Sequence, residues 1–382
     1  MNSMDSILRQ FSAEGATHLY SSPPSVLTPA DLYRAKDDAL YREMIAGSNI
    51  YLITARRRVL INPYDLQLQG RTVHGSFFLV MDETGEQPIP FSYEIPPITP
   101  GDRDAIEQVQ VAPNGTHLLI TTATRQVITA AHIVVANASS ALHTEQRDMN
   151  VLYVGQGLGK VNALTAVDRL LNHTTLQRIL AEASTNTPEL EISLLLYRFE
   201  HGRTVISNGG DLNLDPEACE QEDHAHFERL RSVRLNRDEV VTLAEAALIN
   251  HFKPQYNTLL KSTNFAAQTH KKIKPLKKLL AKGITGLTVE ICSANINARL
   301  FTRDALPLEP SELMPAHVLQ GQAFDNEQDK RAWFEHVREM AHTHLAQFPL
   351  TTPQERETFM HGMVWLGQTQ RERIWPMHGK AE

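Results

Sequence analysis

Apolar positions along the chain follow two different periods, and these periods predict where helices and strands form. Residues 29–46 have the spacing of an amphipathic helix, with Thr28 as N-cap and Pro29 in the first turn. From residue 49 the pattern changes to short β-rich runs, at residues 50–54, 59–61 and 73–81. Asn114-Gly115 is a turn signal between two further short runs. We therefore predict that residues 1–125 form an α+β domain with an antiparallel sheet. Their sequence pattern does not indicate a function.

The rest of the chain has a different pattern, with longer helical stretches. Residues 126–260 predict a small mixed or antiparallel sheet flanked by helices, with strands at 132–136, 151–154 and 190–199 and helices at 161–172, 174–183 and 237–252. Residues 261–382 predict a basic segment followed by a mainly helical region, with helices at 276–281 and 327–348, one after Thr352, and a strand at 287–291. The expected fold class is α+β throughout.

The first stretch with candidate chemistry is Val151-Leu-Tyr-Val-Gly-Gln-Gly157 and the helix after it. Tyr153 is expected at the sheet surface, and the small Gly155 lets a following segment pass close to the sheet. Arg169 and His173 are spaced i and i+4, which places a cation and an imidazole on one face of a helix. Such a face is suited to contact a phosphate.

The second stretch lies about seventy residues later, at residues 245–257. Glu245 is expected on a helix whose buried side carries Leu248 and Ile249, and Pro254 ends that helix shortly before Asn257. The alanines around Glu245 predict a crowded site, where an unpaired carboxylate would be costly.

In this order, the Tyr-Val-Gly tract, the Arg-Leu-x-x-His helix and the Glu-x-x-Leu-Ile…Lys-Pro-x-Tyr-Asn segment resemble GIY-YIG nucleases. The resemblance covers about residues 126–260 and implies a metal-dependent endonuclease. It implies that Glu245 binds one divalent metal, Mg²⁺ or Mn²⁺, that Arg169 binds the phosphate and that Tyr153 positions the attacking water. His173 would be a second proton or phosphate contact, and Gly155 and Asn257 would be structural.

The first tyrosine motif of that family has no obvious counterpart upstream of Tyr153. We expect the strand at residues 132–136 to replace it, with His132 in the tyrosine's place, where its imidazole would take the proton of the water. His143 is the alternative candidate.

The distribution of charge along the chain predicts one local surface patch that binds nucleic acid. The net charge of −7 argues against a broadly basic surface, so binding must come from one region. Between residues 258 and 289 there is no acidic residue, and this segment is rich in lysine. The expected nucleic-acid contacts are Lys261, Lys271, Lys272, Lys274, Lys277 and Lys278.

Composition limits the remaining possibilities. The chain has 382 residues, two cysteines and no run of 18 apolar residues, which predicts a cytoplasmic globular protein without a membrane span. The expected substrate is DNA, in a bacterial restriction or anti-phage role, with a homo-oligomer or a defence-complex partner as possible assemblies. The alternative is a catalytically weak or inactive module that binds nucleic acid or supports assembly.

Overall fold

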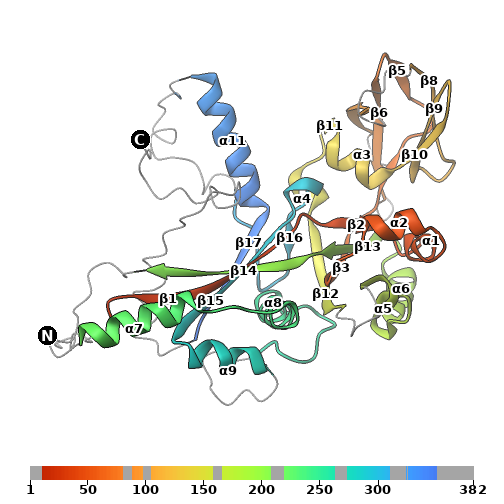
Figure 1. Cartoon of the computed structure of the whole chain (residues 1–382). Coiled ribbons are helices and arrows are strands. Elements are labelled where there is room, and N and C mark those ends of the chain that lie inside the picture. Colours follow the sequence, from red (N-terminus) through yellow and green to blue (C-terminus); the bar gives the residue numbers. More distant parts are fainter. Residues whose placement is uncertain are drawn as a thin grey trace, which may run out of the picture.

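A computed structural model describes residues 11–80, 88–97, 105–157, 166–207, 219–262, 273–309, 324 and 326–350 (Figure 1). The fold is α+β, as predicted, and helices accompany mixed and antiparallel sheets. Two sheets and one long helix form the central part, and a smaller β-rich part lies to one side of it (Figure 1). No helix in these ranges has the length and apolar character that crossing a membrane requires.

A five-stranded sheet carries most of the residues predicted for the site. Its order is β16 (Leu300–Phe301), β12 (Met149–Gln156), β3 (Ile50–Arg57), β13 (Leu190–Tyr197) and β2 (Ser25–Leu27). β3 is antiparallel to both of its neighbours, and β16 pairs only with the first two residues of β12. Beyond Asn150, no other described strand pairs with this side of β12, where Tyr256 and Asn257 bond to its backbone instead.

A four-stranded sheet lies beside the first one. Its order is β14 (Phe199–Ser207), β1 (Glu14–Ser21), β15 (Ile284–Cys292) and β17 (Thr343–Pro349). β1 is parallel to β15, whereas the other pairs are antiparallel. The expected boundary at residue 260 therefore does not follow the sheets, because β15 and β17 complete a sheet that begins with β1.

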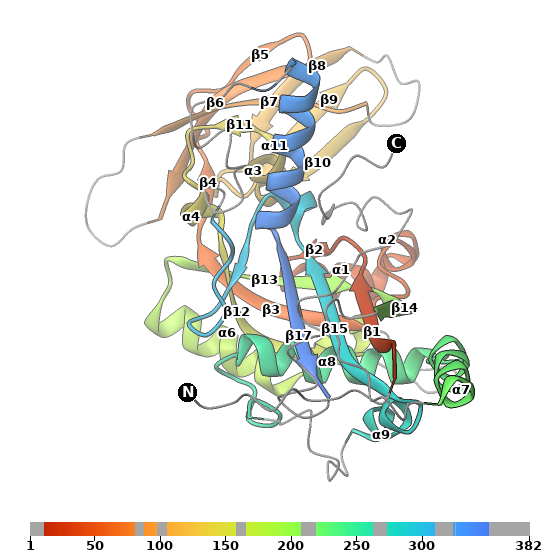
Figure 2. The same cartoon turned by 90° about the vertical axis from the view of Figure 1, so that its left-hand side faces the viewer.

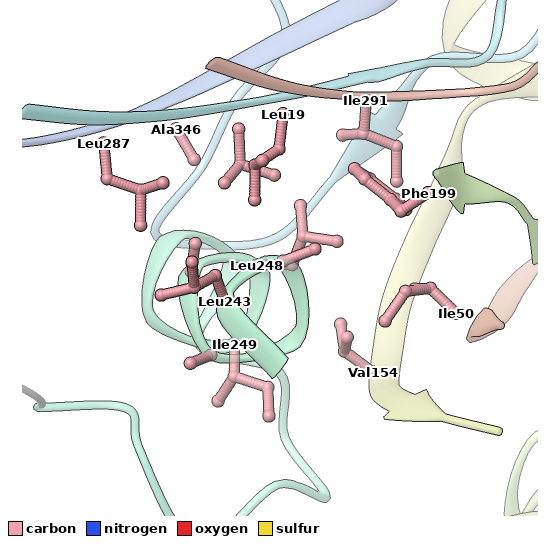
Figure 3. Packing of buried hydrophobic residues seen from close by; sticks show 14 of the residues in the cluster. Leu19, Ile50, Val154, Phe199, Leu243, Leu248, Ile249, Leu287, Ile291 and Ala346 are labelled. Carbon is pink, nitrogen blue, oxygen red and sulfur yellow. The ribbon is translucent and has the colours of Figure 1, made fainter. Parts of the chain in front are cut away.

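Helix α8 (Arg237–Phe252) fills the angle between the two sheets. Figure 3 shows Leu243 and Leu248 directed toward Leu19 and Leu287 of the four-stranded sheet, while Ile50 and Val154 approach from the five-stranded sheet. The helix begins at the capping box of Asn236 and Glu239. It ends at Lys253, whose φ of 45° precedes Pro254. Its bounds match the prediction because cap, apolar face and terminator all agree.

Four short helices cover the opposite face of the five-stranded sheet. They are α1 (Asp31–Asp37), α2 (Ala39–Met44), α5 (Ala166–Leu171) and α6 (Thr174–Asn186). They form one apolar cluster with Tyr51 and Ile53 of β3. The single helix predicted for residues 29–46 is broken at Asp38, whose extended backbone and side chain cap α2.

The segment between β3 and β12, hereafter the inserted domain (residues 58–148), has its own apolar core. Its strands are β4 (Val59–Ile61), β5 (Gln67–Gln69), β6 (Thr72–Leu79), β7 (Ile89–Glu94), β8 (Ile106–Val111), β9 (His117–Thr122), β10 (Gln126–Ala130) and β11 (Ser139–Ser140). Its helices are α3 (Ala131–Asn137) and α4 (Thr144–Arg147). The Asn-Gly turn is present, with Gly115 at φ 71°.

The expected division at residue 125 does not follow this architecture either. β3, from the N-terminal part, pairs with both β12 and β13, so it belongs to the same sheet as Tyr153. The unit that separates is the inserted domain, which lies apart from the two central sheets in both views (Figures 1 and 2).

The remaining described elements are α7 (Glu220–Arg231), α9 (Lys274–Ala281), the 3₁₀ helix η1 (Ala294–Ile296) and α11 (Glu327–Ala341). The helix predicted for residues 327–348 ends at Ala341, and the following residues form β17 instead. The helix predicted after Thr352 lies outside the described residues.

Candidate functional site

Tyr51 and Gly155 face each other across the pairing of β3 and β12. Tyr51 is fully buried, and a Cβ atom at Gly155 would lie 2.5 Å from its Cζ atom and 2.6 Å from its hydroxyl oxygen. Any larger residue at position 155 would therefore displace the tyrosine ring. Gly155 was expected to let a following segment pass close to the sheet, but its close neighbours are Tyr51 of β3 and Tyr153 of its own strand.

Three rings gather around this contact. The rings of Tyr51 and Tyr153 are 6.2 Å apart and stacked, and that of His173 lies 5.7 Å from Tyr51 and 5.0 Å from Tyr153. A register shift between Val151 and Tyr153 brings Tyr153 onto the same side of the sheet as Tyr51. Two phenols and one imidazole therefore form one cluster where β3 and β12 pair.

His173 does not lie on the helix of Arg169, as the i, i+4 spacing had predicted. α5 ends at Leu171, and His173 is the N-cap of α6, where its Nδ1 atom accepts the backbone N–H of Leu176 at 3.1 Å. A capping imidazole in its neutral form carries its proton on Nε2. Burial lowers the pKa of His173, and the charge of Arg169 lowers it further. His173 is therefore arranged as a neutral hydrogen-bond donor.

Arg169 supplies the positive charge of the cluster. It lies in the last turn of α5 and is exposed to solvent. Its charge lowers the pKa values of Tyr51, Tyr153 and Glu245, so it lies within electrostatic reach of all three. An exposed guanidinium beside buried acceptors is suited to bind a phosphate.

Burial raises the pKa values of Tyr51 and Tyr153, whereas Arg169 lowers them. Burial raises the pKa of Tyr51 well above its ordinary value, and Tyr153 and Glu245 add to the effect. Burial and Glu245 also raise the pKa of Tyr153. Among the described residues the Tyr51 hydroxyl has no hydrogen-bond partner of good geometry, although Arg169 lies close enough to lower its pKa. Both hydroxyls therefore carry their protons at neutral pH.

Glu245 approaches the cluster from α8, which packs against β12. Burial raises the pKa of its carboxyl to about 7, against the lowering effects of Arg169 and of a hydrogen bond from the Gln156 backbone. A cation bound there would favour the carboxylate, because burial without an adjacent positive charge disfavours it.

Asn257 fastens β12 to the end of α8. Its side-chain oxygen accepts the backbone N–H of Val154 at 2.9 Å, and its amide nitrogen donates to the carbonyl of Val154 at 2.9 Å. Tyr256 adds a backbone bond from its N–H to the carbonyl of Leu152 at 3.0 Å. These bonds fix the strand between Tyr153 and Gly155, which is the structural role predicted for Asn257.

His132 and His143 do not occupy the place of a first tyrosine. The predicted strand around His132 is helix α3, because Ala131, Val134 and Val135 form a helical face that packs in the core of the inserted domain. The charged neighbours of His132 are Arg56, Glu191 and Asp31, none of which belongs to the ring cluster. His143 is an exposed residue that precedes α4.

The residue that lies beside Tyr153 is Tyr51, not His132. The strand at residues 50–54 was predicted, but it was assigned to a separate domain. The signal that could have identified it is Gly47-Ser-Asn-Ile-Tyr51, a glycine shortly before a strand tyrosine. The inserted domain separates this segment from Tyr153 by about a hundred residues, so proximity in sequence gave no indication of the pairing.

The predicted lysine contacts are only partly described. Lys274 and Lys277 are exposed on α9, whereas Lys278 binds Glu239 at 2.7 Å. Lys261 is half-buried and donates to the carbonyl of Gln255 at 3.4 Å. Lys271 and Lys272 lie outside the described residues.

A metal ion at this site would rely on one protein carboxylate. Within the described part of the chain, no group of three or more His, Cys, Asp or Glu side chains is placed to hold a metal ion. Mg²⁺ is commonly bound through one or two carboxylates, with water and substrate phosphate as its other ligands. Glu245 fits that donor set, because it is one carboxylate within electrostatic reach of the exposed Arg169.

Searches of protein-family models, of curated proteins and of solved structures found no match to this chain. The function is therefore inferred from the geometry of the cluster.

Proposed function

We propose that the chain is a metal-dependent nuclease of the GIY-YIG kind and that its site consists of Tyr51, Tyr153, Arg169, His173 and Glu245. The observation that carries the proposal is the pairing of β3 with β12, which sets Tyr51 opposite Gly155 and next to Tyr153. The two tyrosine strands, the arginine helix and the glutamate helix thereby meet at one sheet edge.

Each side chain has a state that suits phosphodiester hydrolysis. Arg169 would bind the non-bridging oxygens of the scissile phosphate and stabilise the charge that develops on them. The protonated hydroxyls of Tyr51 and Tyr153 would orient the attacking water, and Nε2–H of His173 would donate to water or to phosphate. Glu245 would hold Mg²⁺ or Mn²⁺, whose charge lowers the pKa of nearby water and hydroxyls.

The alternative, an inactive module that only binds nucleic acid, was favoured because no first tyrosine motif was found upstream of Tyr153. Tyr51 supplies a phenol in that place, which favours catalysis over binding alone. DNA is the substrate that we propose, and the restriction or anti-phage role stays a prediction from sequence.

The direct test is cleavage of plasmid DNA, single-stranded DNA and RNA with Mg²⁺ or Mn²⁺, with a chelator as the blank. The wild type should cut DNA only with metal. Arg169→Ala should reduce the rate by at least about 100-fold, because it removes the phosphate contact. The matched control is Arg331→Ala, which removes an exposed arginine from α11, outside the cluster. A protein that binds DNA without cutting it under any of these conditions would be the inactive module.

A further inference from the structure

A cavity of about 630 Å³ opens on the α6 side of the five-stranded sheet, lined by residues of β3, β12 and β13 and of the second half of α6. Leu152 lines it, and Leu152 and Tyr153 pack against the same apolar cluster because of the register shift in β12. The cavity therefore begins one residue from Tyr153. Its size lies within the range of small-molecule sites, roughly 300–1,000 Å³.

The lining combines apolar surface, aromatic rings and amides. Ala55, Leu152 and Ile192 of the sheet and Ile179 of α6 contribute apolar atoms, and Tyr256 and Phe301 contribute rings. Four amide side chains also line the cavity: Gln146, Asn150, Asn186 and Gln255. A nucleobase matches this lining, because its faces are apolar and its edges carry both donors and acceptors.

The charges around the cavity do not favour a phosphate. Asp148 is held by Arg299 at 2.7 Å, and Arg56 is paired with Glu191. Glu182 accepts from the hydroxyl of Tyr256 and binds Arg178.

Two exposed residues on the rim, Arg57 and Glu145, have opposite charges. The lining contains two arginines and three acidic residues, so it carries no net positive charge and suits a neutral base more than an anionic backbone.

Tyr256 is already placed as a stacking platform. The guanidinium carbon of Arg178 lies 5.5 Å from the centroid of its ring, and the same ring lines the cavity. Its backbone bond to Leu152 and its hydroxyl bond to Glu182 hold it in position.

We propose that this cavity binds the base of a nucleotide adjacent to the scissile phosphate. The substrate is then a nucleic acid with an unpaired nucleotide at the cleavage position, because a base inside a duplex is stacked and paired and cannot enter a pocket. This assignment rests on the proposed nuclease function, since Arg169 and Glu245 define where the phosphate lies.

Binding without catalysis tests the cavity by itself. The probe is a single-stranded DNA oligonucleotide that contains 2-aminopurine, whose fluorescence reports stacking, titrated in the presence of a chelator. Tyr256→Leu removes the ring and keeps apolar volume, so it should weaken binding about fivefold or more and abolish the stacking signal. Tyr256→Phe keeps the ring and should bind like the wild type. The matched control is Tyr64→Leu in the inserted domain, where the tyrosine is 92% exposed.

Cleavage supplies the second arm of the experiment. Wild type should cut an intact oligonucleotide about fivefold or more faster than one with an abasic nucleoside beside the scissile phosphate, and Tyr256→Leu should cut both equally. Phe301→Leu repeats the comparison at the other ring, which keeps the test decisive if Tyr256→Leu fails to fold.

The outcomes separate the two proposals. Cleavage by wild type that is indifferent to base removal overturns the base pocket and leaves the nuclease standing. Ring-dependent oligonucleotide binding in a protein that never cuts supports the pocket and overturns the nuclease. Binding that does not change in either ring variant overturns the pocket.

Discussion

The ring cluster on the five-stranded sheet and the buried Asn62 network of the inserted domain differ in how their polar groups are satisfied. In the inserted domain, Asn62 donates to the hydroxyl of Ser76 at 3.1 Å, and that hydroxyl donates to Asp65. At the edge of β12, in contrast, burial shifts the pKa values of Tyr51 and Glu245, and the Tyr51 hydroxyl lacks a well-formed partner in the described structure. Polar groups that the fold does not use for its own hydrogen bonds remain available for a ligand. The sheet is therefore the region where we expect chemistry.

The largest effect is expected at Glu245. Glu245→Gln keeps size and helix propensity, so the cleavage rate should fall at least 100-fold, about 2.7 kcal/mol, while the thermal midpoint does not decrease. Cleavage rates with Mg²⁺ and thermal unfolding of the same preparation measure this. Undiminished cleavage by the variant would remove Glu245 from the site.

Variants of Asn257 at the site and of Asn62 in the inserted domain compare the two regions in their effect on stability. Each asparagine is a buried amide that uses both of its polar atoms, Asn257 on Val154 and Asn62 within the inserted domain. Replacing either by Ala should cost about 2 kcal/mol in the free energy of unfolding, since it leaves buried groups unsatisfied. Only Asn257→Ala should also slow cleavage per folded molecule. Equal losses of activity in both variants would contradict the distinction between the two regions.

A pH effect on stability is expected where α8 meets the four-stranded sheet. The Nε2 atom of His251 and the Nδ1 atom of His344 are 3.1 Å apart, and burial lowers their pKa values to about 3 and about 4. The unfolded chain therefore binds more protons than the folded one between pH 4 and the ordinary histidine pKa of about 6.5.

The free energy of unfolding should then fall as the pH drops through that window, by up to about 1.4 kcal/mol per unit for each histidine. Urea titrations at pH 5 and pH 7 measure the effect. His344→Gln should reduce the slope, whereas the exposed His143→Gln serves as the control. A wild-type slope that His344→Gln leaves unchanged would assign the pH effect to other groups.

The smallest effect is expected on α9. Lys274 and Lys277 are exposed, and neutralising both to Gln should weaken DNA binding equally on all sequences and reduce the salt dependence by up to about 0.9 per lost contact. Lys278→Gln is the comparison, because that lysine is already engaged by Glu239. An unchanged slope in the double variant would make α9 a solvated helix face.

Local pattern predicted the elements in which cap, apolar face and terminator agree. α8 is the clearest case, and β12 and the start of α6 also follow from local pattern. Local pattern gave a wrong prediction where two signals in the same segment conflicted. Ile133-Val134-Val135 is β-branched and reads as a strand, yet Val134 and Val135 with Ala131 also have helical spacing, and packing in the inserted domain selects the helix.

The partnership of Tyr51 with Gly155 could not be predicted from local pattern. Strand pairing over about a hundred residues depends on which chain segments share a core, and periodicity does not contain that information. The break between α5 and α6 was predicted, but the N-cap role of His173 was not, since a histidine N-cap is less usual than Ser, Thr, Asp or Asn.

The most direct test of the site compares Tyr51 with His132 in one cleavage assay at saturating metal. Tyr51→Phe removes one hydroxyl and should lower the rate at least about 100-fold without loss of stability. His132→Ala, which alters the inserted domain, should cut DNA at the wild-type rate. The opposite result, with Tyr51→Phe fully active and His132→Ala inactive, would contradict the assignment of the site to the edge of β3 and β12.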